Sequence, residues 1–142
     1  MSTSLDDLQR RLGIERELAD ATRKELQRAL VNLDSEDTSI VVSGSLASDE
    51  FTDVSDIDWT LLIDGLSDPL YYDLTSKIME IVRPVAAKEV GREGMFGSMV
   101  FSHDLVHQIG GEDDTDRNTT RRLLLLLESR VVGREDAYRR VV

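Results

Sequence analysis

Two acidic side chains lie two positions apart at the start of an apolar stretch. Asp56 and Asp58 flank Ile57 and precede the largely apolar residues 59–63. If this stretch is a β-strand, side chains two positions apart project from the same face, so the two carboxylates lie side by side. Neighbouring carboxylates repel each other, and a hard divalent cation relieves that repulsion. The pair therefore predicts a site for Mg²⁺ or Mn²⁺.

A Gly-Ser pair ends the preceding apolar stretch. Residues 39–43 are few and β-branched, as in a strand, and Gly44 and Ser45 follow them directly. Gly44 lets the backbone approach a ligand closely, and Ser45 adds a hydroxyl and an N–H group at a turn. Such a turn suits phosphate oxygens. Together with the acid pair, it predicts binding of a nucleoside triphosphate and its metal ion.

In this order, the two motifs resemble the signature of the polymerase-β-type nucleotidyltransferase superfamily, which is apolar-Gly-Ser, a spacer, then Asp-apolar-Asp. Ten residues separate Gly44-Ser45 from Asp56-Ile57-Asp58, and the resemblance covers about residues 40–63. It implies a nucleotidyltransferase fold, an α/β (α+β) arrangement with a small mixed β-sheet flanked by helices. It also implies metal-dependent transfer of a nucleoside monophosphate from ATP or another nucleoside triphosphate to an unidentified acceptor, with release of pyrophosphate.

The resemblance further implies a third carboxylate from a neighbouring strand, which would complete a site for two metal ions. Asp104 is the preferred candidate because it resembles the apolar-flanked Asp of related enzymes, if the strand runs that far, and Glu89 is the alternative if residues 85–90 form the strand. An acid that is missing or supplied from outside is a third possibility. The expected site has Gly44 and Ser45 at the phosphates and Asp56, Asp58 and Asp104 as catalytic metal ligands.

Two kinds of function follow from these motifs. The first is an active nucleotidyltransferase. The alternative is a catalytically weak or inactive module for nucleotide binding or interaction, for example a component of a toxin–antitoxin pair. The open question of the third acid affects turnover more than it affects fold or triphosphate binding.

Composition limits the class of protein. The chain has 142 residues, a formal net charge of −11 and no cysteine, a length that fits one domain with a single core. The negative charge argues against nucleic acid as a partner of this domain, because a nucleic-acid backbone usually requires a basic face. There can be no disulfide or thiolate metal site, and no apolar run reaches membrane-spanning length. These features favour the cytoplasm and argue against a membrane partner.

The elements that must position the site begin with an amphipathic helix. Leucines spaced mostly by three or four residues run through residues 4–33, with a break possible near Gly13. Ser4 and Asp7 have the spacing of a capping box. Strands are expected at 39–43 and 56–63. The acids of the connection between them are expected to be solvated: Asp49, Glu50 and Asp53.

The middle of the chain predicts a helix and a third strand. Ser67-Asp68-Pro69 is a helix start, and the helix should end before Pro84. Residues 85–97 indicate a hairpin or mobile loop, and residues 95–101 a strand. Ser102 is expected to cap a short helix at 104–109. His103 and His107 are interpreted as surface or hydrogen-bonded residues, because no third ligand with metal spacing follows them.

The last third predicts helices. Asp114-x-Asp116-x-Asn118 imitates an EF-hand loop but lacks its later Gly and Glu, so capping by Asp116 or Asn118 is expected instead of calcium binding. A helix at 119–130 contains five consecutive leucines, which must sweep around the helix axis. Some of Leu123–Leu127 should be exposed, as a patch covered by a second copy or by a further C-terminal helical domain. The single domain is thus expected to comprise an N-terminal helical segment (1–35), a catalytic core (39–110) and C-terminal helices (116–142), and the abrupt end suggests a domain cut from a longer chain.

Overall fold

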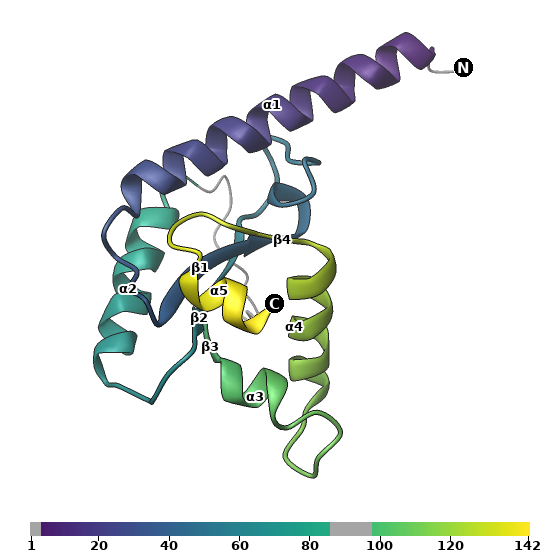
Figure 1. Ribbon diagram of the computed structural model, residues 1–142. Coiled ribbons are helices and arrows are strands. Elements are labelled where there is room, and N and C mark those ends of the chain that lie inside the picture. The colour runs from purple at the N-terminus through teal and green to yellow at the C-terminus, as the bar shows by residue number, and fades with distance from the viewer. Residues whose placement is uncertain (1–3, 86–97) are drawn as a thin grey trace.

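The computed structural model describes residues 4–85 and 98–142. Within these residues the chain forms a mixed α/β structure in which helices surround a small sheet (Figure 1). The helices are α1 (Leu5–Ala29), the 3₁₀ turn η1 (Gly44–Leu46), α2 (Leu70–Val82), α3 (Ser102–Val106), α4 (Asp116–Leu127) and α5 (Asp136–Val141). The strands are β1 (Thr38–Ser43), β2 (Asp58–Ile63), β3 (Ser98–Phe101) and β4 (Ser129–Val131).

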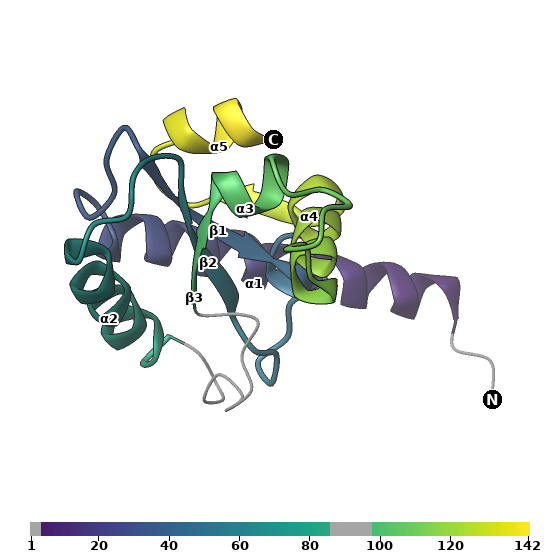
Figure 2. The same cartoon turned by 90° about the horizontal axis from the view of Figure 1, so that it is seen from below.

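The four strands form one mixed sheet in the order β3-β2-β1-β4. β1 is antiparallel to both of its neighbours, whereas β2 and β3 are parallel. Seen from below, α3 and α5 lie over one face of the sheet and α2 lies beneath the other (Figure 2). The small mixed sheet with flanking helices, expected from the sequence, is therefore present.

The alternation of side chains along the strands builds a core on each face of the sheet. On one face, apolar side chains of β1 and β2 pack with buried residues of α1 and α2. On the other face, a smaller cluster joins the sheet to α3 and α4: Val41, Leu62, Val100, Leu105 and Leu125. Because both faces of β1 are buried, the strand carries no alternation of apolar and polar residues, and its consecutive β-branched residues 40–42 are how the sequence identifies it.

α1 is longer than the sheet that it covers. Ser4 caps it by accepting a hydrogen bond from the Asp7 N–H, and the helix continues through Gly13 without the break considered above. Its C-terminal half carries the buried residues, while its first turns extend past the body of the protein (Figure 1). The apolar stripe of that projecting end is exposed: Leu5, Leu8 and Leu12.

The last third of the chain differs most from the expectation. The helix expected at 119–130 begins earlier and ends at Leu127, after which β4 joins the edge of the sheet beside β1. Residues 116–142 therefore include a strand as well as helices. Three residues are too few to show the alternating pattern of a strand, and the preceding leucines dominate the local signal.

Two expected helix caps were also wrong. The N-cap of α4 is Thr115, whose hydroxyl accepts from the Asn118 N–H at 3.1 Å, so neither Asp116 nor Asn118 caps the helix. The N-cap of α3 is Phe101, and the Ser102 hydroxyl instead donates to Asp64 Oδ1 at 2.7 Å. Among the residues that the structure describes, no helix has the length and apolar character needed to cross a membrane.

Candidate functional site

The Gly44-Ser45 motif forms a tight turn at the end of β1. Gly44 has a φ of +65°, in the left-handed region that favours glycine. Its carbonyl oxygen accepts hydrogen bonds from the N–H groups of Ala47 and Ser48, both at 3.0 Å, and the Glu50 N–H donates to the Ser45 carbonyl at 3.0 Å. The chain thus reverses within a few residues before it enters the connection to β2.

The turn lies directly against one carboxylate of the acid pair. Asp58 is the first residue of β2 and pairs in register with Ser43, the last residue of β1. A Cβ atom added to Gly44 would lie 3.0 Å from Asp58 Oδ2. Two features therefore favour glycine at position 44: the left-handed backbone conformation and the close Asp58 carboxylate. The structure brings the two sequence motifs together at one end of the β1–β2 pair.

The two aspartates influence each other electrostatically. Asp58 is half-buried, and this burial, followed by the negative charge of Asp56, raises the pKa of the Asp58 carboxyl above its ordinary value of 3.8. Asp56 is exposed and lies two residues before β2, so the strand starts later than expected and Asp56 belongs to the connection. The predicted repulsion between the two carboxylates is present. A cation bound between them would relieve it.

Asp104 does not join this pair. β2 and β3 run parallel, with Ile63 paired to Phe101 at their C-terminal ends, and Asp104 follows in α3. Asp58 is at the opposite, N-terminal end of β2. The expected three-carboxylate cluster of Asp56, Asp58 and Asp104 is therefore not formed.

The described part of β3 offers no substitute for Asp104, because residues 98–101 are Ser, Met, Val and Phe. Glu89, the other candidate, lies outside the described residues. Within residues 4–85 and 98–142, no group of three or more His, Cys, Asp or Glu side chains has a geometry that could hold a metal ion. The site as described consists of two carboxylates and the turn.

A buried arginine that the sequence analysis did not single out supports the turn. Arg23 of α1 is 8% exposed, and its Nη1 donates to the Leu46 carbonyl oxygen at 2.5 Å. The same nitrogen lies 2.8 Å from Asp49 Oδ1. The sequence contains a signal for this role, because Arg23 lies between Thr22 and Leu26 on the side of the helix that is buried. A cation at such a position needs a partner.

Asp49, in the connection between β1 and β2, forms ion pairs, whereas it had been expected to be fully solvated. Its φ of +65° is uncommon for a residue with a side chain. Arg130 of β4 contacts its second oxygen at 3.0 Å. Burial alone would raise the pKa of Asp49, but the hydrogen-bonded Arg23 and the nearby Arg130 outweigh it and lower the pKa. Glu50 and Asp53 are exposed, as predicted.

The acidic stretch before α4 has a structural role. Arg122 donates to both oxygens of Asp114, at 2.6 and 3.0 Å, and its Nε donates to the Leu105 carbonyl at 2.6 Å. The N–H groups of Gly110 and Thr115 also donate to the Asp114 carboxylate. These contacts form a clasp, Asp114–Arg122, that ties the α3–α4 connection to α4.

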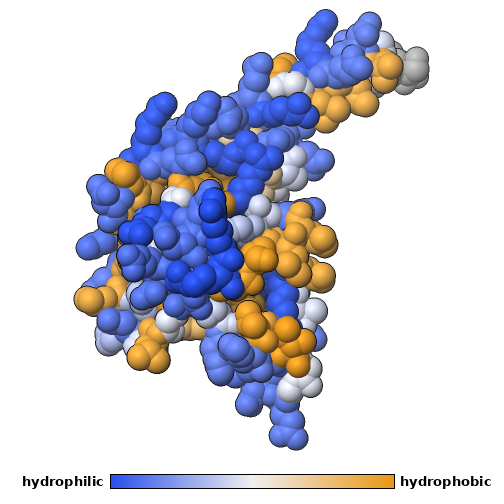
Figure 3. All heavy atoms as spheres, viewed as in Figure 1, coloured by the Kyte–Doolittle hydropathy of each residue, from blue (hydrophilic) through white to orange (hydrophobic). Residues whose placement is uncertain are grey.

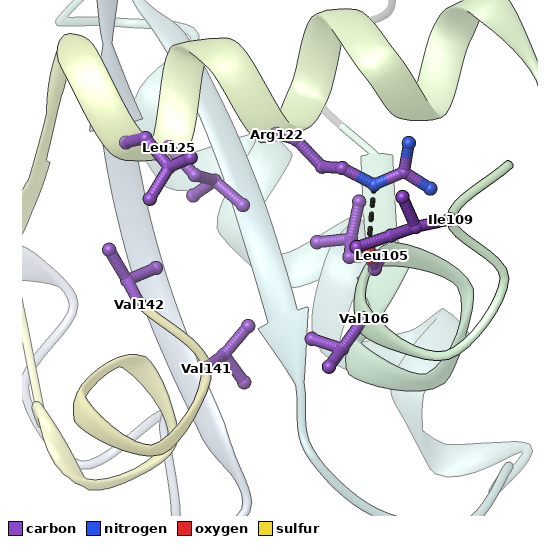
Figure 4. A pocket seen from close by; sticks show the side chains of 8 residues that line it. Leu105, Val106, Ile109, Arg122, Leu125, Val141 and Val142 are labelled. Atoms are coloured by element: carbon purple, nitrogen blue, oxygen red, sulfur yellow. Dashed lines mark hydrogen bonds between the residues drawn. The ribbon is translucent and has the colours of Figure 1, made fainter.

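The paired histidines belong to the same region. His103 and His107 lie with ring centroids 5.3 Å apart, and both are exposed, as the sequence indicated. Residues of α3, α4 and the C-terminal end of the chain line an apolar pocket of about 220 Å³ (Figure 4). The side chains that line it include Leu105, Val106, Leu125 and Val141. The pocket shares none of its lining residues with the Gly44 turn or the acid pair.

Comparisons with known proteins assign no family to the chain. A scan of the chain against protein-family models, a search of curated proteins and a search of solved structures each gave no match.

Proposed function

We propose that the chain is a nucleotidyltransferase that binds a nucleoside triphosphate with a divalent cation at the Gly44 turn and the Asp56–Asp58 pair. The observation that carries the proposal is the 3.0 Å between Asp58 Oδ2 and the position of a Cβ on Gly44. It places a carboxylate directly against the turn. The small mixed sheet with flanking helices supports a nucleotidyltransferase fold, since this is the arrangement that the sequence resemblance implies.

The donor set fits Mg²⁺ or Mn²⁺. Asp56 and Asp58 are hard oxygen ligands of like charge, and the raised pKa of Asp58 reflects the cost of keeping that charge without a counter-ion. Mg²⁺ is usually held by one or two carboxylates together with substrate phosphates, which matches a site with two acids beside a turn. When bound, the cation would neutralise charge on the phosphates and on the attacking and leaving oxygens.

The chain's own residues would act mainly by positioning. The Gly44-Ser45 turn would hold phosphate oxygens through backbone N–H groups and the Ser45 hydroxyl. The acceptor oxygen forms a bond to the α-phosphorus while the bond to the bridging oxygen breaks, and pyrophosphate leaves. The acid pair would fix the charged end of the triphosphate relative to the turn, so that the α-phosphate faces the acceptor.

A second candidate function is nucleotide binding without turnover. The observation that favours it is the position of Asp104 at the opposite end of β2 from Asp58. Two carboxylates are enough to bind one cation with its triphosphate, but two-metal chemistry normally uses a further ligand. In this case the protein would be a sensor or interaction module.

The decisive experiment measures binding and pyrophosphate release separately. The chain is titrated calorimetrically with each common nucleoside triphosphate in the presence of Mg²⁺ or Mn²⁺, and released pyrophosphate is assayed in the same mixtures. Binding with release supports the enzyme, and binding without release supports the sensor. Asp58→Asn should abolish binding, whereas Asp53→Asn, at an exposed acid of the same connection, should not. Absence of binding by the parent chain contradicts both functions.

A further inference from the structure

Arg23 connects the long N-terminal helix to the backbone of the candidate phosphate turn. Its guanidinium donates to the carbonyl of Leu46, the last residue of η1, at 2.5 Å. It also pairs with Asp49, three residues further on, at 2.8 Å. The two contacts lie on either side of Ala47 and Ser48, whose N–H groups donate to the Gly44 carbonyl. One side chain therefore holds both ends of the segment that shapes the turn.

This arrangement is unusual for an arginine in a helix that packs on a sheet. An aliphatic residue between Thr22 and Leu26 would extend the apolar face of α1, and burying a guanidinium instead incurs a desolvation cost. The hydrogen bond to the Leu46 carbonyl and the ion pair with Asp49, which lies within 2.8 Å but lacks hydrogen-bond geometry, offset part of that cost. Asp49 in turn holds a left-handed backbone conformation, which persists when the surroundings determine it.

The groups around Arg23 show where its charge acts. Asp20, on the preceding turn of α1, is 3.8 Å away, exposed, and already paired with Lys24 at 2.8 Å. Asp49 is the closer and less exposed acid, and Arg130 contacts its other oxygen. The charge of Arg23 is thus directed at the turn and its connection, and Arg130 supports the same carboxylate from the sheet.

We infer that Arg23 is a positioning residue for the triphosphate site, which fixes the Gly44-Ser45 turn through the Leu46 carbonyl and Asp49. This inference rests on the proposed function of the site. It assigns to α1 a role beyond covering the sheet, because its contact with the turn sets the geometry in which phosphate oxygens are bound. Arg23 itself touches no substrate in this scheme.

The test combines a local structural readout with a binding readout. Amide hydrogen exchange of Ser48 and Glu50, whose N–H groups close the turn, is measured by NMR for the parent chain and for Arg23→Gln, with β1 and β2 amides as the reference for global opening. Affinity for a nucleoside triphosphate with Mg²⁺ is measured calorimetrically on the same samples. Arg28→Gln is the matched control, because Arg28 is an exposed arginine of the same helix.

Two further variants keep the test valid if Arg23→Gln folds poorly. Arg23→Lys retains one charged donor and should restore part of the affinity. Asp49→Asn retains an acceptor and a tolerance for the left-handed conformation, but it removes the charge. We expect about tenfold weaker binding or more for Arg23→Gln, as is typical for loss of a charged hydrogen bond. Exchange at Ser48 and Glu50 should be faster, with β1 and β2 unchanged, and the control should match the parent.

The outcomes separate this inference from the proposed function. If the parent binds nucleotide and Arg23→Gln binds equally well, the positioning role is wrong while the function stands. If exchange at Ser48 and Glu50 is unchanged, Arg23 does not hold the turn. If Arg23→Gln loosens β1 and β2 as much as the turn, its role is general stability. If the parent fails to bind any triphosphate, the proposed function fails, and with it any role of Arg23 at the phosphates.

Discussion

At the scale of single residues, the negative charge of Asp58 lowers the stability of the metal-free fold, and the same charge is what the proposed cation site requires. Its folded-state pKa is raised above 3.8 by burial and by Asp56. The folded chain therefore holds this proton more tightly than the unfolded chain, and stability falls as the pH rises from 3.8 through the raised pKa. The cost remains at neutral pH, where the carboxylate is ionised. A metal ion would remove it.

The first prediction concerns Asp58→Asn. Without metal, this variant should be equal to or slightly more stable than the parent at neutral pH, and the difference should shrink as the pH falls towards 3.8. Metal-dependent triphosphate binding should fall by orders of magnitude. Asp56→Asn should have the same effect on binding, because it removes the other charge. Thermal melts at several pH values check the stability, and a large loss in the metal-free state would show that the acids are structural.

The second prediction compares the two residues of the turn. Gly44→Val should abolish triphosphate binding, because its φ is +65° and any Cβ would lie 3.0 Å from the Asp58 carboxylate. Ser45→Ala should weaken binding modestly, by about 0.5–1.5 kcal/mol for one hydrogen bond. Calorimetric titration with nucleotide and Mg²⁺ measures both. Equal and small effects would argue against a phosphate-binding turn.

At the scale of elements, the Asp114–Arg122 clasp lowers the pKa of its carboxyl, whereas the pKa of Asp58 is raised. The hydrogen bonds from Arg122, with help from the Gly110 N–H, hold the pKa of the Asp114 carboxyl far below its usual range. A lowered folded-state pKa gives stability that is present above the unfolded value of 3.8 and is lost as the pH falls below it. The connection between α3 and α4 should therefore loosen in acid.

The third prediction follows from this loss of stability at low pH. Asp114→Asn should lower the melting temperature at pH 7, and the difference from the parent should fade as the pH drops below 3.8, because the unfolded parent takes up a proton there while the folded parent still holds the carboxylate ionised. Asp113→Asn, at the exposed neighbouring acid, serves as the control and should melt like the parent. A stability difference that does not change with pH would mean that the charge of Asp114 contributes nothing. Added calcium should have no effect on either variant.

The sequence predicted the elements that carry strong periodicity or clear end signals. α1 and its Ser4 cap, β1, and the end of α2 before Pro84 were found because apolar spacing and backbone chemistry are local properties. The Gly44-Ser45 and Asp56-Ile57-Asp58 motifs were predicted to form one site, and the register of β1 and β2 places Asp58 against the Gly44 turn.

What the sequence could not predict depends on contacts between distant segments. β4 is a strand only because β1 offers it an edge, and its residues carry no periodic signal of their own. Asp104 was placed in the site by its apolar neighbours, but the parallel register of β2 and β3 puts it at the wrong end. Asp49 was expected to be solvated and Arg23 was not singled out, because each appears as an ordinary charge until the fold pairs them.

At the scale of the whole molecule, the leucine run leaves an exposed apolar surface, as expected from its length. Leu125 is buried, whereas Leu123, Leu126 and Leu127 are 52%, 65% and 75% exposed. Apolar side chains gather beside α4 and under the projecting end of α1 on the same side of the molecule (Figure 3). Exposed apolar patches of this kind often mark interaction sites.

The fourth prediction is that the chain forms a concentration-dependent dimer through this surface. Leu127→Glu should weaken the dimer in analytical ultracentrifugation, because it places a charge on the most exposed leucine of the run. Leu66→Glu is the control, since Leu66 is 90% exposed but lies in the connection before α2. A chain that remains monomeric at high concentration, or a dimer that both substitutions weaken equally, would contradict this assignment.

The position of β4 in the sheet also determines when the fold can be completed during synthesis. β1 lies in the interior of the sheet, but one of its two neighbours is β4, residues 129–131. Val41 therefore cannot pair with Val131 until the end of the chain has been made. While the ribosome adds the intervening residues, that edge of β1 has no partner, and unpaired edges of nascent β-branched strands are prone to aggregate. α1 emerges first and can shield one face of β1, but it cannot satisfy the edge. A released chain that ends before Ser129 should therefore depend on chaperones far more than one that ends after Val131.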